Sequence, residues 1–164
     1  MTLAFDAMMF ARSVHAEQVR KYTGNPYADH LAEVAGIVAT TWPLGASDIM
    51  IAVAWLHDCM EDQGITPGVL ESLFGPEVAY GVELLSDMET GNRAERKVAS
   101  CVRLAGAPGW VQTIKCADLI SNTSSVTKRD QKFAATYLAE KRDLLAVLKR
   151  ADPRLRALAT ELSA

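Results

Sequence analysis

A dense cluster of side chains that can ligate a metal ion or move a proton lies near residue 60: His57, Asp58, Glu61 and Asp62. The cluster follows an unbroken apolar run, Ile49–Leu56. Residues three and four apart share one face of a helix, so we expect His57 to lie above Glu61, and Asp58 above both acidic residues. Burial of such groups is costly without a counter-charge, which favours a divalent metal ion. The alternative is a helix whose charged end only reaches water.

A metal site built on His57 and Asp58 needs further ligands from distant segments. The chain contains only three histidines: His15, His30 and His57. His30 follows a turn rich in glycine and proline, at the beginning of an expected helix. Asp118 lies in an otherwise apolar stretch, Val111–Ile120. A carboxylate there is either exposed or a buried ligand, and its neighbours do not decide between the two.

Helical periodicity of apolar residues runs along most of the chain, and turn and capping signals divide it into segments. We expect helices over Thr2–Lys21, Tyr27–Thr41 (closed by Trp42 and Pro43), from the Ser47 cap through His57 to a stop at Gln63 and Gly64, Pro67–Phe74, Pro76–Leu85, Arg93–Leu104, Trp110–Thr123, Gln131–Lys149 and Pro153–Leu162. No stretch alternates convincingly with a period of two. The sequence predicts an all-α fold, a compact bundle of about eight helices, in one domain over residues 1–164.

Composition narrows the possible partners. Hydrophobic residues make up 49% of the chain and charged residues 23%, as in ordinary globular proteins. The net charge of −3 argues against nonspecific binding to nucleic acid, although a metal ion can still attract an anionic substrate. The longest apolar run is too short to cross a membrane, and no leader peptide is evident. The cysteines are odd in number and suggest a reduced, cytoplasmic protein: Cys59, Cys101 and Cys116. The oligomeric state stays open.

Three segments resemble one known family in the same order. HAEQVRKYTGNPYADH (residues 15–30) matches every fixed position of the pattern H-x-x-Q-x-R-K-x-x-G-x-P-Y-x-x-H. The His57–Asp58 pair follows, and KCADLISN (residues 115–122) is similar to K-x-A-D-x-x-x-N. These segments are typical of RelA/SpoT-type alarmone hydrolases, a group of HD-domain metal-dependent phosphohydrolases that includes small stand-alone relatives. An HD pair by itself is weak evidence, whereas this ordered set is strong.

The resemblance implies a four-ligand metal site. The implied ligands are two imidazoles and two carboxylates: His30, His57, Asp58 and Asp118. Such a mixture suits Mn²⁺, Fe²⁺ or Zn²⁺, and the family implies Mn²⁺ as the cofactor, with other divalent metals possible. Four protein ligands leave room for water and a phosphate oxygen on the larger ions.

The resemblance also implies roles around that site. Glu61 and Asp62 would be catalytic, orienting the attacking water or accepting its proton. The implied substrate-binding residues are Arg20, Lys21, Lys97, Asn122 and Tyr137. Cations at a helix end also complement the helix dipole, and a solvated surface is the alternative interpretation for all of these residues. We interpret His15 as a packing residue or one that contacts a ligand.

The function implied is hydrolysis of (p)ppGpp, guanosine 3′,5′-bis(diphosphate) or its triphosphate analogue, at the 3′-pyrophosphate, giving GDP or GTP and pyrophosphate. One departure concerns the nucleotide: the family has D-R-L-H-N or D-K-L-x-N where this chain has Leu119 and Ser121. An HD phosphohydrolase for another small nucleotide, such as a nucleoside monophosphate or NADPH, is therefore an alternative. A nucleotide-binding sensor without turnover is a third.

Overall fold

The computed structural model describes residues 2–41, 46–129 and 131–164, with side chains from 125 to 133 excluded. Ten α-helices occupy these ranges, and no strand occurs within them beyond an isolated bridge between Val19 and Pro26. The predicted all-α class is confirmed. Trp42 and Pro43, expected to close the second helix, lie outside the described residues. None of the described helices is apolar over a length that would span a bilayer.

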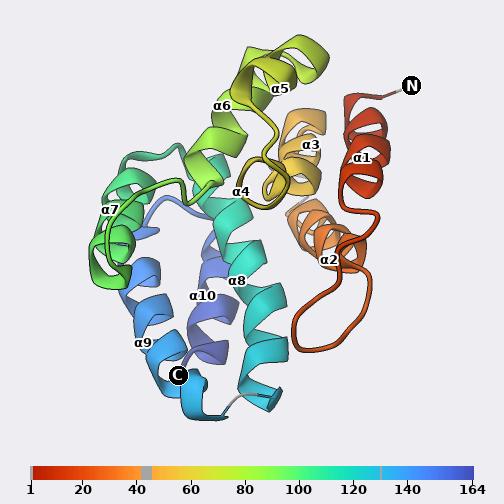
Figure 1. Ribbon diagram of the computed structural model, residues 1–164. Helices are drawn as coiled ribbons and strands as arrows, with labels where there is room; N and C mark the ends of the chain where they lie inside the picture. Colours follow the sequence, from red (N-terminus) through yellow and green to blue (C-terminus); the bar gives the residue numbers. More distant parts are fainter. Residues whose placement is uncertain (1, 42–45, 130) are drawn as a thin grey trace. The chain divides into compact units, whose positions relative to one another are not determined.

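The chain divides into two compact units, Met1–Ser86 and Asp87–Ala164. The first unit holds α1 (Leu3–Val14), α2 (Tyr27–Ala39), α3 (Asp48–Leu56), α4 (Cys59–Gln63), α5 (Pro67–Phe74) and α6 (Pro76–Leu85). Helix α3 packs against α1, α2 and α6 and supplies much of the buried core of this unit (Figure 1). Its almost continuous apolar sequence explains this central place, because a helix that is hydrophobic all round must be buried.

Two residues act at the N-terminus of α3: Ser47 caps this helix, and Asp48 binds the N-terminus of α1. The Ser47 hydroxyl accepts a hydrogen bond from the backbone N–H of Met50, as the sequence predicted. The Asp48 carboxylate accepts the backbone N–H groups of Leu3 and Ala4, at 2.9 and 3.2 Å. These N–H groups have no partner within α1, since the first turn of a helix leaves its donors unsatisfied. One carboxylate thus joins the N-termini of two helices that are distant in sequence.

The first helix is shorter than predicted, because α1 ends at Val14 and not near Lys21. The chain after it folds back on itself: the Arg20 N–H donates to the Asn25 carbonyl at 2.8 Å, and the Tyr27 N–H donates to the Gln18 carbonyl at 2.9 Å. Gly24, with a φ of 74°, makes the turn possible. Backbone hydrogen bonds across this loop replace those that a longer helix would have made.

The helix expected to run through His57 to Gln63 is interrupted. Helix α3 ends at Leu56 and α4 begins at Cys59, with His57 and Asp58 between them. Asp58 has φ −100° and ψ 0°, in a sparsely populated region where active-site residues are often found. The prediction of one continuous helix was wrong here, and the break changes where the two side chains point.

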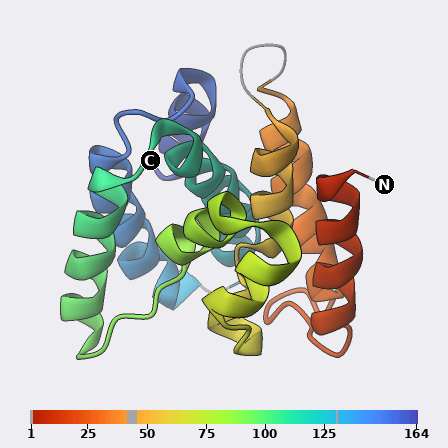
Figure 2. The ribbon, with the colours of Figure 1, turned by 90° about the horizontal axis from the view of Figure 1, so that it is seen from above.

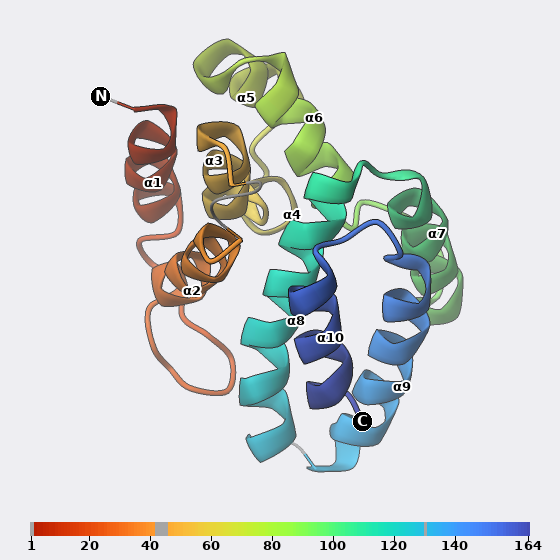
Figure 3. The ribbon, with the colours of Figure 1, turned by 180° about the vertical axis from the view of Figure 1, so that it is seen from behind.

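The second unit contains four helices: α7 (Arg93–Gly106), α8 (Gly109–Arg129), α9 (Gln131–Val147) and α10 (Pro153–Leu162). Helix α8 packs against α9 and α10, and α7 packs against α9 (Figure 3). Viewed from above, α7 again lies beside α9 (Figure 2). Helix α8 continues past Thr123, where the sequence analysis ended it, because no glycine or proline follows to stop it.

Two polar residues join α8 to the loop before α10. Buried Gln112 donates to the Leu104 carbonyl and accepts from the Arg150 N–H, both at 2.8 Å. The Thr113 hydroxyl accepts the Asp152 N–H at 2.9 Å. Gly109 lets the loop come close, since a Cβ there would lie 2.5 Å from the Arg150 carbonyl oxygen. Buried hydrogen bonds that satisfy all their polar partners favour a single packing of α8 against the loop before α10.

Candidate metal centre and active site

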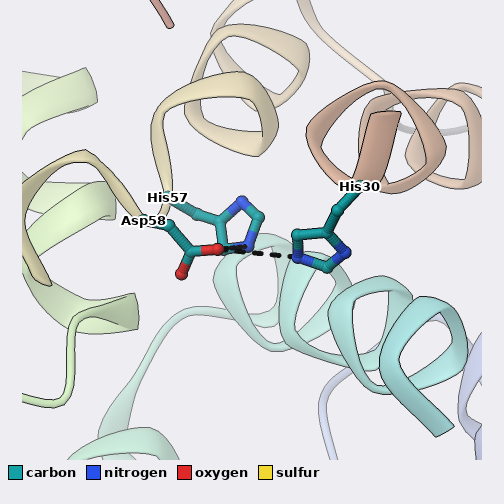
Figure 4. A group of neighbouring side chains, drawn as sticks. All are labelled: His30, His57 and Asp58. Atoms are coloured by element: carbon teal, nitrogen blue, oxygen red, sulfur yellow. Dashed lines mark ion pairs between the residues drawn. The ribbon is translucent and has the colours of Figure 1, made fainter. Parts of the chain in front are cut away.

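Three predicted ligands converge within the first unit: His30 from α2, and His57 and Asp58 from the break between α3 and α4 (Figure 4). The Oδ2 atom of Asp58 lies 3.0 Å from His57 Nε2 and 3.5 Å from His30 Nε2. Both imidazoles are buried, with exposed fractions of 1% and 2%. One ligand atom from each residue lies within 4.8 Å of the others. The three side chains can therefore hold a divalent metal ion.

The hydrogen bonding of His57 suits a metal ligand. Its Nδ1 lies 2.8 Å from the Ala54 carbonyl oxygen. A carbonyl can only accept, so Nδ1 carries the proton and Nε2 keeps its lone pair in the neutral ring. This is the usual arrangement of a metal-bound histidine, in which the second nitrogen is fixed by a backbone carbonyl. The donor set and its tautomer fit a divalent ion.

Tyr27 is a contact of this group that the sequence analysis did not single out. Its hydroxyl donates to Asp58 Oδ2 at 2.7 Å, and its ring meets the His30 ring edge-on with centroids 5.4 Å apart. The ring also stacks on His15 at 5.2 Å. Tyr27 thus touches two of the three candidate ligands. It occupies a fixed position of the segment over residues 15–30, and that was the available signal.

Glu61 and Asp62 lie on α4, one turn after the ligands, and both are exposed. The Asp62 Oδ2 atom accepts a hydrogen bond from Gln18 Nε2 at 2.8 Å. The Gln18 Oε1 atom accepts in turn from Gln63 Nε2 at 2.5 Å and from His15 Nδ1 at 2.6 Å. The Gln18 side-chain amide therefore holds Asp62 in position. The orientation of that amide is determined by the two donors to its oxygen, Gln63 and His15.

His15 completes a directional chain of hydrogen bonds. With its proton on Nδ1, the His15 ring accepts at Nε2, which lies 3.6 Å from Cys59 Sγ. Burial, together with the negative charges of Asp58 and Asp62, raises the pKa of the Cys59 thiol to about 12, so the sulfur keeps its proton. Cys59 thus donates to His15, His15 donates to Gln18, and Gln18 donates to Asp62. Sequence reasoning missed Gln18 and Gln63, although Gln18 is another fixed position of the same segment.

The two cations of the loop after α1 differ in their surroundings. Arg20 is largely buried and forms an ion pair with Glu33 of α2, with 3.1 Å between Nη1 and Oε2. Lys21 is exposed, and its ammonium lies 5.2 Å from the centre of the Tyr22 ring. Substrate binding by either residue stays a prediction. Arg20 also anchors the loop to α2, a role that needs no substrate.

Asp118 belongs to the second unit and is buried on α8. Its carboxylate accepts from Lys115 Nζ at 2.9 Å and from Asn122 Nδ2 at 2.6 Å. These partners lie one turn before and one turn after it on the same helix. The sequence left open whether Asp118 is exposed or buried, and the structure shows that it is buried. Its role as the fourth ligand, and the contact of Asn122 with substrate, stay predictions.

Lys97 forms an ion pair with Asp87 at 3.3 Å, within the second unit. Asp87 also accepts from the Ser100 hydroxyl at 2.8 Å and from Arg103 Nη2 at 2.7 Å. Burial alone raises the pKa of Asp87, but Lys115, Ser100, Lys97 and Arg103 outweigh it and lower the pKa to about 2. Asp87 therefore positions the Lys97 ammonium.

Four further positions of the second unit bear on the predictions. Tyr137, predicted to bind substrate, is buried on α9 with the Lys141 ammonium over its ring at 4.7 Å. Glu95, next to the predicted Lys97 segment, forms a capping box with Asn92 at the beginning of α7. Leu119 and Ser121, the departures from the family pattern, are both buried. Burial accounts for an apolar residue at position 119.

The chain is similar to known proteins over most of its length. A family model described as the HD domain matches residues 7–159. A probable guanosine-3′,5′-bis(diphosphate) 3′-pyrophosphohydrolase of Synechocystis is 32% identical over 87% of this chain, which spans 19% of that protein. The human guanosine-3′,5′-bis(diphosphate) 3′-pyrophosphohydrolase is 32% identical over 75% of this chain and 69% of its own length.

Solved structures show the same fold. A metazoan ortholog of SpoT, described as hydrolysing ppGpp, superposes with a TM-score of 0.90 at 23% identity, over 99% of this chain and 94% of its own. A Listeria monocytogenes structure gives a TM-score of 0.72 at 22% identity, over 87% of this chain and 96% of its own length. The family match covers both the residues that gather His30, His57 and Asp58 and those around Asp118. The chain therefore belongs to the HD-domain family.

Proposed function

We propose that this protein is a metal-dependent phosphohydrolase that removes the 3′-pyrophosphate of guanosine 3′,5′-bis(diphosphate). The observation that carries the proposal is the convergence of His30, His57 and Asp58 next to the carboxylates of α4. The printed activities of the Synechocystis and human relatives support the choice of substrate. The chain spans only 19% of the length of the Synechocystis relative, so the proposal concerns hydrolysis alone.

In this proposal His30, His57, Asp58 and Asp118 hold the ion, and Mn²⁺ is the ion we propose. A divalent ion in such a site acts as a Lewis acid toward phosphoryl oxygen and lowers the pKa of water. The chain's own contribution is orientation. Ala54 fixes the His57 ring through Nδ1, and Tyr27 fixes the Asp58 carboxylate.

Glu61 and Asp62 are the proposed proton acceptors. Water adds to the phosphorus bonded to ribose O3′, the O3′–P bond breaks, and pyrophosphate leaves while O3′ takes a proton. The proton lost by the water passes to a carboxylate of α4. Asp62 is the candidate we favour, because the hydrogen bond from Gln18 holds its carboxylate in one orientation.

Charged and polar residues of both units are proposed to bind the nucleotide. We assign Arg20 and Lys21 to the base and its sugar, and Lys97 to the phosphates. Asn122 and Tyr137 would contact the ribose or a phosphate oxygen. Cationic side chains suit an anion of this charge, and Lys21 is exposed enough to reach it.

The test is turnover of guanosine 3′,5′-bis(diphosphate) by the purified chain loaded with Mn²⁺, with GDP and pyrophosphate separated by ion-exchange chromatography. We expect Asp58→Ala to lose both metal binding and activity. Asp29→Ala, an exposed carboxylate on the first turn of α2, is the matched control and keeps both. Full activity in Asp58→Ala would disprove the proposal.

Other nucleotides belong in the same assay, because Leu119 and Ser121 replace residues of the alarmone-hydrolase pattern. GMP, NADPH and 5′-nucleotides are the comparison substrates. Phosphate release from one of these, with no turnover of guanosine 3′,5′-bis(diphosphate), would keep the HD chemistry and change the substrate. Binding without turnover of any nucleotide would favour a sensor.

A further inference from the structure

The second unit contains a pocket of about 420 Å³ between α7 and α9. Most of its lining surface is apolar, and five aliphatic side chains from the two helices contribute to it: Val98, Val102, Ala105, Leu144 and Val147. Val98 and Val102 are 65% and 69% exposed, so the apolar wall continues to the protein surface. A pocket of this size is large enough for a small organic molecule.

Three ammonium groups also line this pocket, those of Lys97, Lys115 and Lys141. Two of them are paired: Lys97 with Asp87 at 3.3 Å and Lys115 with Asp118 at 2.9 Å. Lys141 lies over the Tyr137 ring, and within the described residues no carboxylate comes within 4.0 Å of its nitrogen. Among the described side chains that line the pocket, Lys141 is thus the ammonium group with no carboxylate at ion-pair distance.

The acidic residues of the pocket are engaged elsewhere or exposed. Glu140 forms a two-pronged ion pair with Arg93, with contacts of 2.6 and 2.8 Å. Asp87 accepts from Arg103 as well as from Lys97. Asp143, the remaining carboxylate of the wall, is exposed to solvent. None of the three offers Lys141 a buried partner.

The electrostatics agree with this geometry. Burial lowers the pKa of the Lys141 ammonium to about 8, with a further lowering from Lys115 and Lys97 that Asp118 and Asp87 only partly offset. The Lys141 ammonium has already lost part of its water contact through burial, so an anion that enters the pocket stabilises it by supplying a counter-charge.

We propose that this pocket is a binding site for a small organic anion with an apolar body, a carboxylate whose head group pairs with Lys141 and whose hydrocarbon part packs between α7 and α9. The positive charge of Lys141 favours a carboxylate head group, and the aliphatic walls favour a hydrocarbon body. The site is built entirely from residues of the second unit. Its lining includes Lys97, which the proposed function assigns to the phosphates, but the proposal rests on Lys141 and the aliphatic walls, which the proposed hydrolase does not use.

Octanoate is the probe, and octanamide is its neutral counterpart of the same shape. Isothermal titration calorimetry on the full chain should show octanoate binding at least tenfold more tightly than octanamide. Lys141→Met should remove this preference, and Lys149→Met, an exposed lysine outside the pocket, should retain it. Equal affinities for the two probes in the wild-type chain, or no binding of octanoate, would overturn the proposal. So would an unchanged preference in Lys141→Met.

A second measurement, by NMR on the wild-type chain, tests the site without relying on the folding of a variant. Octanoate should shift the methyl NMR signals of Val98, Val102 and Leu144, and leave those of Val53, in the core of the first unit, unchanged. Ala105→Phe, which fills the pocket, should abolish these shifts while the thermal unfolding transition is kept. Shifts elsewhere in the chain, with none at these three residues, would reject the site.

Discussion

The Tyr27 hydroxyl donates a hydrogen bond of 2.7 Å to Asp58 Oδ2, the atom that also faces the Nε2 nitrogens of His30 and His57. A carboxylate with such a donor keeps its orientation toward the two rings. Tyr27 comes from the first turn of α2, one turn before His30. The same turn of helix therefore supplies a candidate ligand and the group that orients another.

Tyr27→Phe should weaken Mn²⁺ binding by about 10- to 100-fold, the usual effect of losing a residue that orients a metal ligand. The ring and its packing on His15 and His30 remain, so the fold should be kept. Calorimetric titration with Mn²⁺ measures the change. Tyr80→Phe, at an exposed tyrosine of α6, is the control. An unchanged affinity in Tyr27→Phe would show that the hydroxyl does not position Asp58.

Gln18 should affect turnover through Asp62. We expect Gln18→Leu to lower kcat about tenfold and leave Mn²⁺ affinity unchanged, because the amide holds Asp62 and touches no candidate ligand. In a double-mutant cycle, adding Gln18→Leu to Asp62→Asn should cost little more than Asp62→Asn alone. Additive losses would mean that Gln18 acts independently of Asp62.

Asp87 should make the second unit sensitive to acid. Its pKa is about 2 in the folded protein and near 4 in an unfolded chain, so its contribution to stability is complete above about pH 4 and is lost as pH falls toward 2. The shift corresponds to about 2 kcal/mol. Urea unfolding of Asp87→Asn across this range should show a smaller pH dependence than the wild type. Asp6→Asn, on the exposed face of α1, should match the wild type.

Gly109 should tolerate no side chain. A Cβ would lie 2.5 Å from the Arg150 carbonyl oxygen, so Gly109→Ala should lower the free energy of unfolding by about 1–3 kcal/mol. Gly36→Ala is a matched control, because Gly36 lies on the exposed side of α2 with open space around it. There alanine should stabilise the helix by about 0.5–1 kcal/mol. Similar effects at both positions would argue against the close approach at Gly109.

Several elements follow from the sequence because their signals are local. Helix α5 begins at Pro67 after the Thr66 cap and ends at Phe74 before Gly75, and α10 covers Pro153–Leu162, as predicted. Caps, prolines and glycines act within a few residues, so a sequence contains all that is needed to read them. The types and order of the candidate ligands are local information of the same kind.

Longer-range contacts were decided by the tertiary structure. Gln18 and Asp62, like His15 and Cys59, are separated by 44 residues, and they meet because α1 packs against α3 and α4. Backbone hydrogen bonds within the loop that folds back after α1 replace the last turns expected of this helix. No periodicity in the sequence encodes such meetings, since they depend on which helix faces bury one another.

The helical class, the ligand candidates and the acidic pair of α4 can be read from local sequence signals. The folded chain adds that His57 and Asp58 leave the helix, so that these two adjacent side chains point at each other with 3.0 Å between Nε2 and Oδ2. On a continuous helix, neighbouring residues point about 100° apart and do not face one another. The backbone break, with Asp58 at φ −100° and ψ 0°, brings them together.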